Sequence, residues 1–287
     1  MENIRGAALM TVAMALFALE DMFVKRAAGH LPVGEVLMLF GAGGMIAFAA
    51  LALAKGQPLW HAAVASRLML VKAVFEILGR IGYTLGIALT PLSNASAILQ
   101  ATPLVVVAGA AILFRERVGA RRWAAIGIGF VGVLVILRPG LEGFVPAAMW
   151  TVLGLLGFAG RDLSTRAAPK VLTNFQLGIY GFAALIPAGA IILAVTGGGA
   201  TPSAAALAPI GGAVVVGVVA YACLTGAMRL GEVAVVTPFR YTRLIFALIL
   251  GMLVFAERPD AATLLGAALV VASGVYTLLR GARKQGL

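Results

Sequence analysis

Ten long apolar stretches joined by short polar connections constrain the fold of this sequence more than any other feature. A helix needs roughly 20 apolar residues to cross the hydrocarbon core of a bilayer, and each stretch is close to that length. Hydrophobic residues make up 62% of the 287 residues, more than a soluble core of this size can bury. The sequence therefore predicts an all-α integral membrane protein with ten transmembrane helices in a single domain, residues 1–287. The predicted spans are 4–27, 33–54, 68–89, 92–114, 121–138, 145–166, 174–196, 207–229, 232–255 and 261–280.

The Lys and Arg residues that give the chain its formal net charge of +11 cluster at the ends of the apolar stretches. This placement is typical of topology signals rather than of a nucleic-acid surface. With the N-terminus in the cytoplasm, the opposite side carries only Lys25, Arg26, Arg138 and Arg258. We therefore predict cytoplasmic N- and C-termini in a bacterial-type inner membrane, which requires an even number of spans. The predicted cytoplasmic basic residues are Arg5, Lys55, Arg67, Arg115, Arg117, Arg121, Arg122, Arg166, Lys170, Arg229, Arg280, Arg283 and Lys284.

The two halves of the chain align when one is displaced by 141 residues. Asp21 then falls on Asp162, and Phe114-Arg115-Glu116-Arg117 on Phe255-Ala256-Glu257-Arg258. Biased composition can imitate a repeat, but it does not align charged residues in this way. We therefore expect repeat one at about 4–138 and repeat two at about 145–280. Each repeat holds five spans, and this odd number places the second copy in the membrane upside down relative to the first.

Both repeats carry a charged segment followed by a glycine-containing helix. The segments are Leu113-Phe114-Arg115-Glu116-Arg117, followed by Gly127, Gly129 and Gly132, and Val254-Phe255-Ala256-Glu257-Arg258, followed by Gly266 and Gly274. In these features and in its paired five-helix units, the chain resembles the drug/metabolite transporter superfamily, specifically its EamA-type ten-helix members. Within that group it is similar to the YddG-type exporters of aromatic amino acids. The resemblance implies a secondary transporter that exports amino acids or other metabolites by alternating access through a central cavity between the repeats.

Charged side chains inside the predicted spans indicate a substrate pathway, because an ionisable group in lipid costs several kcal/mol. Asp21 and Asp162 are candidates for contacts to a cationic group, although both lie late in their spans and a position at the water interface would also explain them. Lys72, Glu76 and Arg80 recur at four-residue intervals and share one helix face. Arg80 can hold a substrate carboxylate, or it can form an internal salt bridge with Glu76.

The ninth predicted span is unusually polar around Pro238 and Arg240. Proline removes a helix donor, so we expect local unwinding there, either to bind ligand or for packing alone. Gln100 of the fourth span aligns with Tyr241, which predicts that the two helices line the same cavity. Aromatic side chains in the spans can stack on an apolar part of a substrate or can simply fill the core. The candidate substrate-binding residues are Phe17, Asp21, Arg80, Tyr83, Gln100, Phe158, Asp162, Tyr221, Arg240 and Tyr241.

Other functional classes find little support in the sequence. Cys223 is the only cysteine, and His30 and His61 are isolated, so no metal site is indicated. The chain lacks the Walker motif, and we expect no cofactor, no nucleic-acid partner and no enzymatic activity. The expected partners are a small-molecule substrate and membrane lipid, with the protein as a monomer. An organic cation, a drug or another metabolite stays open as the substrate, and an integral-membrane enzyme is a distant alternative.

Overall fold

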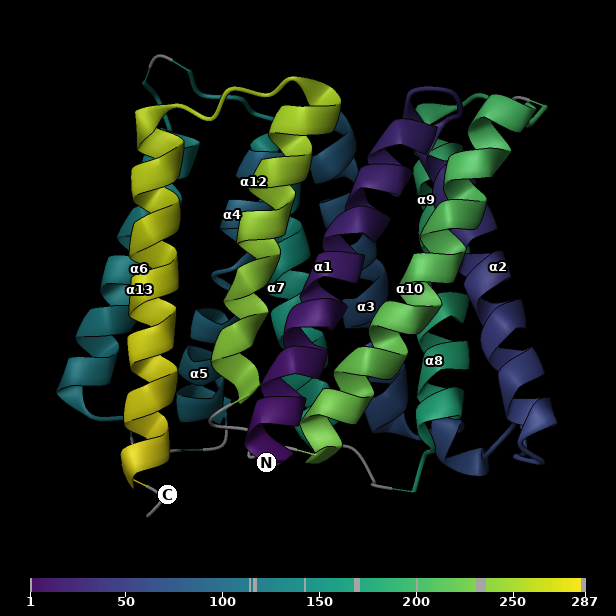
Figure 1. Ribbon diagram of the computed structural model, residues 1–287, viewed down its shortest axis with the longest axis horizontal. Coiled ribbons are helices and arrows are strands. Elements are labelled where there is room, and N and C mark those ends of the chain that lie inside the picture. The colour runs from purple at the N-terminus through teal and green to yellow at the C-terminus, as the bar shows by residue number, and fades with distance from the viewer. Residues whose placement is uncertain are drawn as a thin grey trace.

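The computed structural model describes residues 2–113, 115, 118–141, 143–167, 171–199, 201–230 and 236–284, and these residues form a bundle of helices (Figure 1). The described residues contain no strand. The helices are α1 Glu2–Ala28, α2 Val33–Ala54, η1 Ala62–Ala65, α3 Arg67–Leu89, α4 Leu92–Leu99, α5 Thr102–Leu113, α6 Ala120–Leu137, α7 Ala148–Ala167, α8 Asn174–Ala183, α9 Leu185–Thr196, α10 Ala204–Leu230, η2 Thr237–Tyr241, α12 Thr242–Phe255 and α13 Ala261–Lys284. Each predicted span corresponds to one helix or to two consecutive helices.

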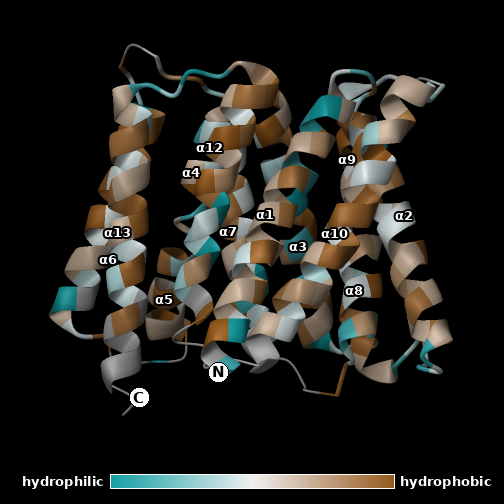
Figure 2. Ribbon diagram, viewed as in Figure 1, coloured by the Kyte–Doolittle hydropathy of each residue, from teal (hydrophilic) through white to brown (hydrophobic). Residues whose placement is uncertain are grey.

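Six segments of the described residues are long and apolar enough to cross a membrane, by length and composition. They are Ile4–Ala28, Val33–Ala54, Leu92–Leu113, Asn174–Thr196, Ala204–Ala227 and Pro238–Phe255, and Trp123–Leu137 and Ala261–Thr277 are shorter apolar helices. Figure 2 shows hydrophobic residues along most of the bundle, with hydrophilic residues concentrated at its two ends and inside α1, α3 and α7. Helices α3 and α7 have sufficient length, but they carry charges within the bundle. The predicted all-α integral membrane fold is confirmed.

The two repeats interlock in opposite orientations. Helix α1 begins and α13 ends at the same end of the bundle, whereas the chain enters α7 from the other end (Figure 1). The first helix of each repeat packs on the third helix of the other, which pairs α1 with α10 and α7 with α3. The last helices, α6 and α13, pack on each other, and α2 packs on α8 and α9. These exchanged pairs confirm the inverted two-repeat architecture, in which helices of one repeat pack on helices of the other.

The backbone irregularities also occur at repeat-related positions. The break between α4 and α5 falls at Gln100, and the change from η2 to α12 falls at Tyr241, which is the residue aligned with Gln100. Arg115 and Ala256, which are also aligned, both adopt a positive φ, of 54° and 53°. The helical geometry of the fourth segment therefore changes at the same aligned residue in both repeats, and a residue in the same left-handed conformation follows each segment.

Close packing between α3 and α7 depends on glycine, as is usual for helix pairs in lipid. A Cβ atom at Gly154 would lie 2.6 Å from the Tyr83 nitrogen, and one at Gly157 would lie closer still to the Gly79 nitrogen. Neither distance can be relieved by rotating a flexible side chain. Backbone atoms of α3 and α7 therefore contact each other directly between the two repeats.

We expect Gly154→Ala to lower the free energy of unfolding by about 1–3 kcal/mol, because the added methyl group forces α3 and α7 apart. Thermal unfolding of the detergent-solubilised protein measures this loss. Gly127→Ala is the matched control, since a Cβ at Gly127 meets nothing within 4 Å. Equal melting temperatures for the two variants would contradict the tight α3–α7 contact.

An exposed ion pair joins the ends of α6 and α13. Arg138 pairs with Asp260, and the Thr263 N–H donates to Asp260 Oδ1 at 2.8 Å, so that Asp260 also caps α13. The Arg138 hydrogen bond, helped by the Thr263 N–H, lowers the pKa of Asp260 from 3.8 to about 2. This Arg138–Asp260 pair, which we call the clip, connects repeat one to repeat two outside the membrane-spanning segments.

A depressed carboxyl pKa stabilises the fold above its unfolded value and loses that contribution as the pH falls through the folded value. We therefore expect the Asp260 contribution to be complete above about pH 4 and to disappear toward pH 2. Its size should stay below about 1 kcal/mol, because half of the Asp260 side chain is exposed to screening solvent. Acid titration of the melting temperature should show a shallower decline in Asp260→Asn over this window. An identical decline in the variant would contradict the contribution of the clip.

Candidate functional site

Charged side chains from both repeats meet inside the bundle, in a group that we call the charged seam. Three of its carboxylates are well buried, with exposed fractions of 4% for Glu20, 3% for Asp21 and 5% for Glu76, whereas the Asp162 side chain is 27% exposed. Helices α1 and α3 contribute from repeat one, and α7, η2 and α12 contribute from repeat two. The charged seam consists of Glu20, Asp21, Glu76, Arg80, Arg161, Asp162, Arg240 and Arg243.

A chain of alternating acids and arginines runs through the charged seam. Arg80 lies 3.5 Å from Glu20 and 3.4 Å from Glu76. Arg161 then lies 3.4 Å from Glu76 and 2.8 Å from Asp162. This series of ion pairs connects α1 through α3 to α7, so it crosses from one repeat to the other. Arg80 and Arg161 therefore both form ion pairs with protein carboxylates. Of the two roles considered for Arg80, the structure contains the internal salt bridge with Glu76.

Asp21 belongs to a separate pair. Arg243 Nη2 donates to Asp21 Oδ2 at 2.6 Å, and the Tyr83 hydroxyl donates to the same oxygen at 2.8 Å. The Arg243 guanidinium also lies 5.3 Å from the centre of the Phe17 ring and 5.6 Å from that of Tyr83. This arrangement gives Asp21 a cationic partner from the protein itself, across the contact between α1 and α12.

Aromatic rings line the acid–arginine chain. Phe158 lies below two guanidinium groups, 5.7 Å from Arg80 and 4.7 Å from Arg161, and packs edge-on against Tyr83 with 6.0 Å between ring centres. Tyr221 packs edge-on against Phe48 of α2 at 5.3 Å. The rings therefore offer both apolar faces and cation–π contacts next to the charges.

Arg240 differs from the other arginines of the charged seam. Among the described residues its guanidinium has no ion pair or hydrogen bond, and its electrostatic neighbours are Asp162, Arg161 and Arg243. Its backbone carbonyl accepts a hydrogen bond of 3.2 Å from Gln100 Nε2, at the break between α4 and α5. The break between α4 and α5 and the turn η2 thus place in the charged seam an arginine that forms no ion pair with a carboxylate of the described residues.

The structure brings most of the predicted site residues together and separates one. Tyr241 faces away from the charged seam, toward α13, and its hydroxyl is buried against Gly274, where no described residue forms a hydrogen bond with it. Four residues of the charged seam were not among the candidates, namely Glu20, Glu76, Arg161 and Arg243, and Glu76 precedes the candidate Arg80 by one helical turn. Glu20 and Arg161 each adjoin a candidate in sequence, and Arg243 follows Arg240 by three residues, so proximity to a candidate was the available signal. The predicted residues that lie in or against the charged seam are Phe17, Asp21, Arg80, Tyr83, Gln100, Phe158, Asp162 and Arg240, with Tyr221 facing Glu76.

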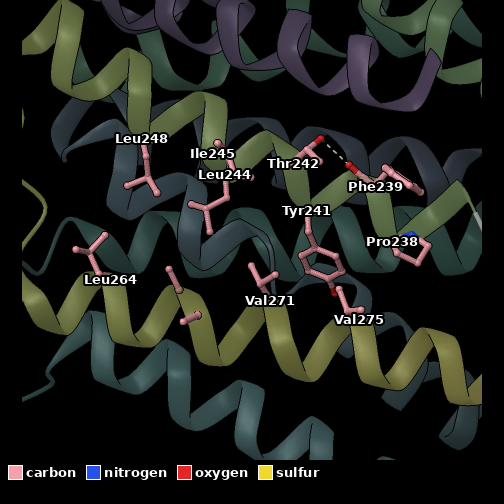
Figure 3. Close-up of a pocket in the computed structure, with 12 residues that line it drawn as sticks. Pro238, Phe239, Tyr241, Thr242, Leu244, Ile245, Leu248, Leu264, Val271 and Val275 are labelled. Carbon is pink, nitrogen blue, oxygen red and sulfur yellow. Dashed lines mark hydrogen bonds between the residues drawn. The ribbon is translucent and has the colours of Figure 1, made fainter. Parts of the chain in front are cut away.

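An apolar groove of about 430 Å³ lies between α12 and α13 (Figure 3). Its lining consists almost entirely of hydrophobic side chains, including Leu244, Leu248 and Leu264, with the ring of Tyr241 on one wall. Ile245 and Leu264 are exposed at its rim, as expected for a surface that faces lipid. The groove and the charged seam therefore lie on opposite sides of the η2 turn.

One known protein family matches almost the whole chain. The model of the EamA-like transporter family matches twice, at residues 4–138 and 143–279. A riboflavin transporter of Rhizobium johnstonii is 30% identical over 75% of this chain and 71% of its own length. An S-adenosylmethionine uptake transporter of Rickettsia bellii is 24% identical over 73% and 71% of the two chains. A pseudopaline exporter of Pseudomonas aeruginosa is 27% identical over 61% of each.

A solved crystal structure shares the fold, with a TM-score of 0.62 at 17% identity, covering 94% of this chain and 98% of the other. The family and these relatives are transporters rather than enzymes. With its apolar helices and its two matched repeats, the chain belongs to the EamA-like transporter family of the drug/metabolite transporter superfamily, as a multi-pass protein of the bacterial inner membrane that transports a small metabolite.

Proposed function

We propose that the chain carries a metabolite of the amino-acid type and that Arg240 holds its carboxylate. The observation that carries this proposal is the Arg240 guanidinium, which forms no ion pair among the described residues although Arg80, Arg161 and Arg243 each do; its neighbouring carboxylate, Asp162, is paired with Arg161. A guanidinium presents a planar fork that matches a carboxylate with two parallel hydrogen bonds. A substrate carboxylate would therefore give Arg240 the ion pair that the other arginines of the charged seam form with protein carboxylates.

The aromatic rings support a substrate with a flat or apolar side chain. Phe17, Tyr83 and Phe158 lie against the guanidinium groups of the charged seam, so a ring bound there would meet both apolar and cationic surfaces. Aromatic amino acids combine such a ring with a carboxylate. S-Adenosylmethionine, which the Rickettsia relatives are named for, likewise combines an amino-acid group with a purine.

Transport by alternating access fits the inverted repeats. Rocking of one repeat against the other would expose the charged seam to either side of the membrane in turn.

We propose export as the direction of transport, by resemblance to amino-acid exporters of the superfamily. We propose cytoplasmic N- and C-termini from the distribution of Lys and Arg. Reporter fusions to the two termini test the orientation, and a periplasmic reporter signal from either would overturn it.

A flavin is the second candidate substrate. The relative that is 30% identical is named a riboflavin transporter, and the flat ring system of riboflavin suits the aromatic lining of the charged seam. Riboflavin has no carboxylate, so its transport would not need Arg240. An organic cation would instead require a buried carboxylate and would tolerate loss of Arg240.

Counterflow in liposomes separates these candidates. Purified protein would be reconstituted with an excess of one unlabelled compound inside, and entry of the same labelled compound would be followed. The panel contains the aromatic amino acids, S-adenosylmethionine, riboflavin and a quaternary ammonium compound. We expect counterflow for at least one compound bearing an amino-acid group, above protein-free liposomes. Counterflow for riboflavin or the quaternary ammonium compound alone would overturn the proposed substrate class.

A further inference from the structure

A second charged cluster lies away from the charged seam, at the end of the bundle where α1, α3 and α12 finish (Figure 1). We propose that Lys25, Glu257 and the N-terminus of α4 form a latch that closes this end of the bundle and opens during transport. Glu257 belongs to repeat two, and the groups that it binds belong to repeat one. The latch therefore connects the two repeats, which rock against each other in the proposed transport cycle.

Glu257 caps α4 from the opposite repeat. The Leu92 N–H donates to Glu257 Oε1 at 2.6 Å, and the Ser93 N–H and hydroxyl donate to Oε2 at 3.0 and 2.8 Å. The first N–H groups of a helix have no intrahelical acceptor, and the helix dipole favours a negative charge at that position. A Cβ at Gly251 would lie 2.5 Å from Glu257 Oε2, so the glycine leaves the space that this carboxylate occupies.

Lys25 makes the complementary contacts at the C-terminus of α3. Its ammonium group donates to the carbonyls of Ile87 and Thr90 at 2.9 and 2.5 Å, and it lies 3.6 Å from Glu257 Oε1. The Phe255 ring lies 5.2 Å from the ammonium group. A cation at the carbonyl end of α3 and an anion at the amide end of α4 each complement the nearer helix dipole as well as each other.

Burial indicates that these contacts exclude water. The side chains of Lys25 and Glu257 are only 15% and 9% exposed, in contrast to the 50% exposure of Asp260 in the nearby clip. Separating Lys25 from Glu257 leaves two uncompensated charges, so this end of the bundle opens only if water reaches both groups as they part. The closed latch thus favours one conformation of the protein strongly.

Helix α4 links the latch to the charged seam. It has 8 residues and runs from Leu92, which is bonded to Glu257, to Leu99, and the Gln100 side chain that follows donates to the Arg240 carbonyl. A displacement of Arg240 on substrate binding would therefore be transmitted along one short helix to the latch. This link rests on the proposed role of Arg240, whereas the closing of the bundle by the latch does not.

Cysteine accessibility tests the latch without any substrate. In a Cys223→Ser background, Ser96→Cys places a reporter thiol on α4, one turn below Ser93, where the native side chain is 2% exposed. The probe is a charged methanethiosulfonate reagent, applied to protein in lipid nanodiscs. We expect Glu257→Gln to raise the labelling rate at least about tenfold, since breaking a buried charge pair changes an equilibrium by more than that factor. Lys25→Met should do the same, and the double variant should add little to either single change.

Arg258→Gln is the matched control, because it removes the exposed charge next to Glu257 and should leave labelling unchanged. Ser93→Ala is a milder variant that removes one of the three donors to Glu257, and we expect an increase of about two- to tenfold. An unchanged rate in Ser93→Ala and Glu257→Gln, or an equal increase in Arg258→Gln, would overturn the latch. Fully additive effects of Lys25→Met and Glu257→Gln would also overturn it. Failure of counterflow for the whole substrate panel would leave these labelling rates unaffected, so the two proposals fail separately.

Discussion

Arg240→Ala is expected to reduce the initial rate of counterflow at least about thirtyfold while leaving thermal unfolding unchanged. Loss of one partner from a buried pair of charges costs about 2 kcal/mol or more, which corresponds to that factor. Stability should persist because the described residues offer the Arg240 guanidinium no ion pair that the substitution could break. The measurement pairs counterflow in liposomes with thermal unfolding of the same preparation.

Two variants bracket this result. Arg240→Lys keeps the charge but loses the planar fork, so we expect an intermediate rate. Arg80→Ala should instead destabilise the protein, because Glu20 and Glu76 would lose their shared guanidinium. Wild-type counterflow by Arg240→Ala would exclude this arginine from substrate binding.

Asp21→Ala is expected to lower the free energy of unfolding by about 3–5 kcal/mol, enough to prevent recovery of a monodisperse protein. The substitution leaves the Arg243 guanidinium buried without its carboxylate and removes the acceptor of the Tyr83 hydroxyl. Gel filtration of the solubilised protein and its melting temperature measure the loss.

Removing both charges together provides the control for the Asp21 prediction. Asp21→Asn combined with Arg243→Gln should be more stable than Asp21→Asn alone, because no unpaired charge is left in the bundle. A normal melting temperature for Asp21→Ala would show that the pair with Arg243 adds nothing to the fold. Asp21 would then be available for a cationic group of the substrate, which was its expected role from sequence.

Much of the fold could be predicted from the sequence because lipid imposes simple rules. A spanning helix must satisfy its own backbone, so span length and charge placement reveal the helices. The alignment of Asp21 with Asp162 revealed the repeat, and the odd number of spans per repeat then required inversion. Pro238 predicted local unwinding, and the structure has the 3₁₀ turn η2 at Thr237–Tyr241.

Partner choice within the charged seam depends on packing between helices, which spacing along one helix does not encode. The Glu76–Arg80 contact follows from a four-residue interval, but the Glu76–Arg161 contact requires α3 and α7 to approach through their glycines. Tyr241 was expected to line the same cavity as Gln100. Successive residues of a helix point about 100–120° apart, so the turn that directs Arg240 toward the charged seam directs Tyr241 toward α13.

Counterflow of an aromatic amino acid and of its amide tests the central claim most directly. Tryptophan and tryptophanamide share a ring and an amino group and differ in the carboxylate that Arg240 is proposed to bind. We predict counterflow of tryptophan by the wild-type protein, little counterflow of tryptophanamide, and loss of this difference in Arg240→Ala. Equal counterflow of the two compounds by the wild-type protein would contradict recognition of a carboxylate at the charged seam.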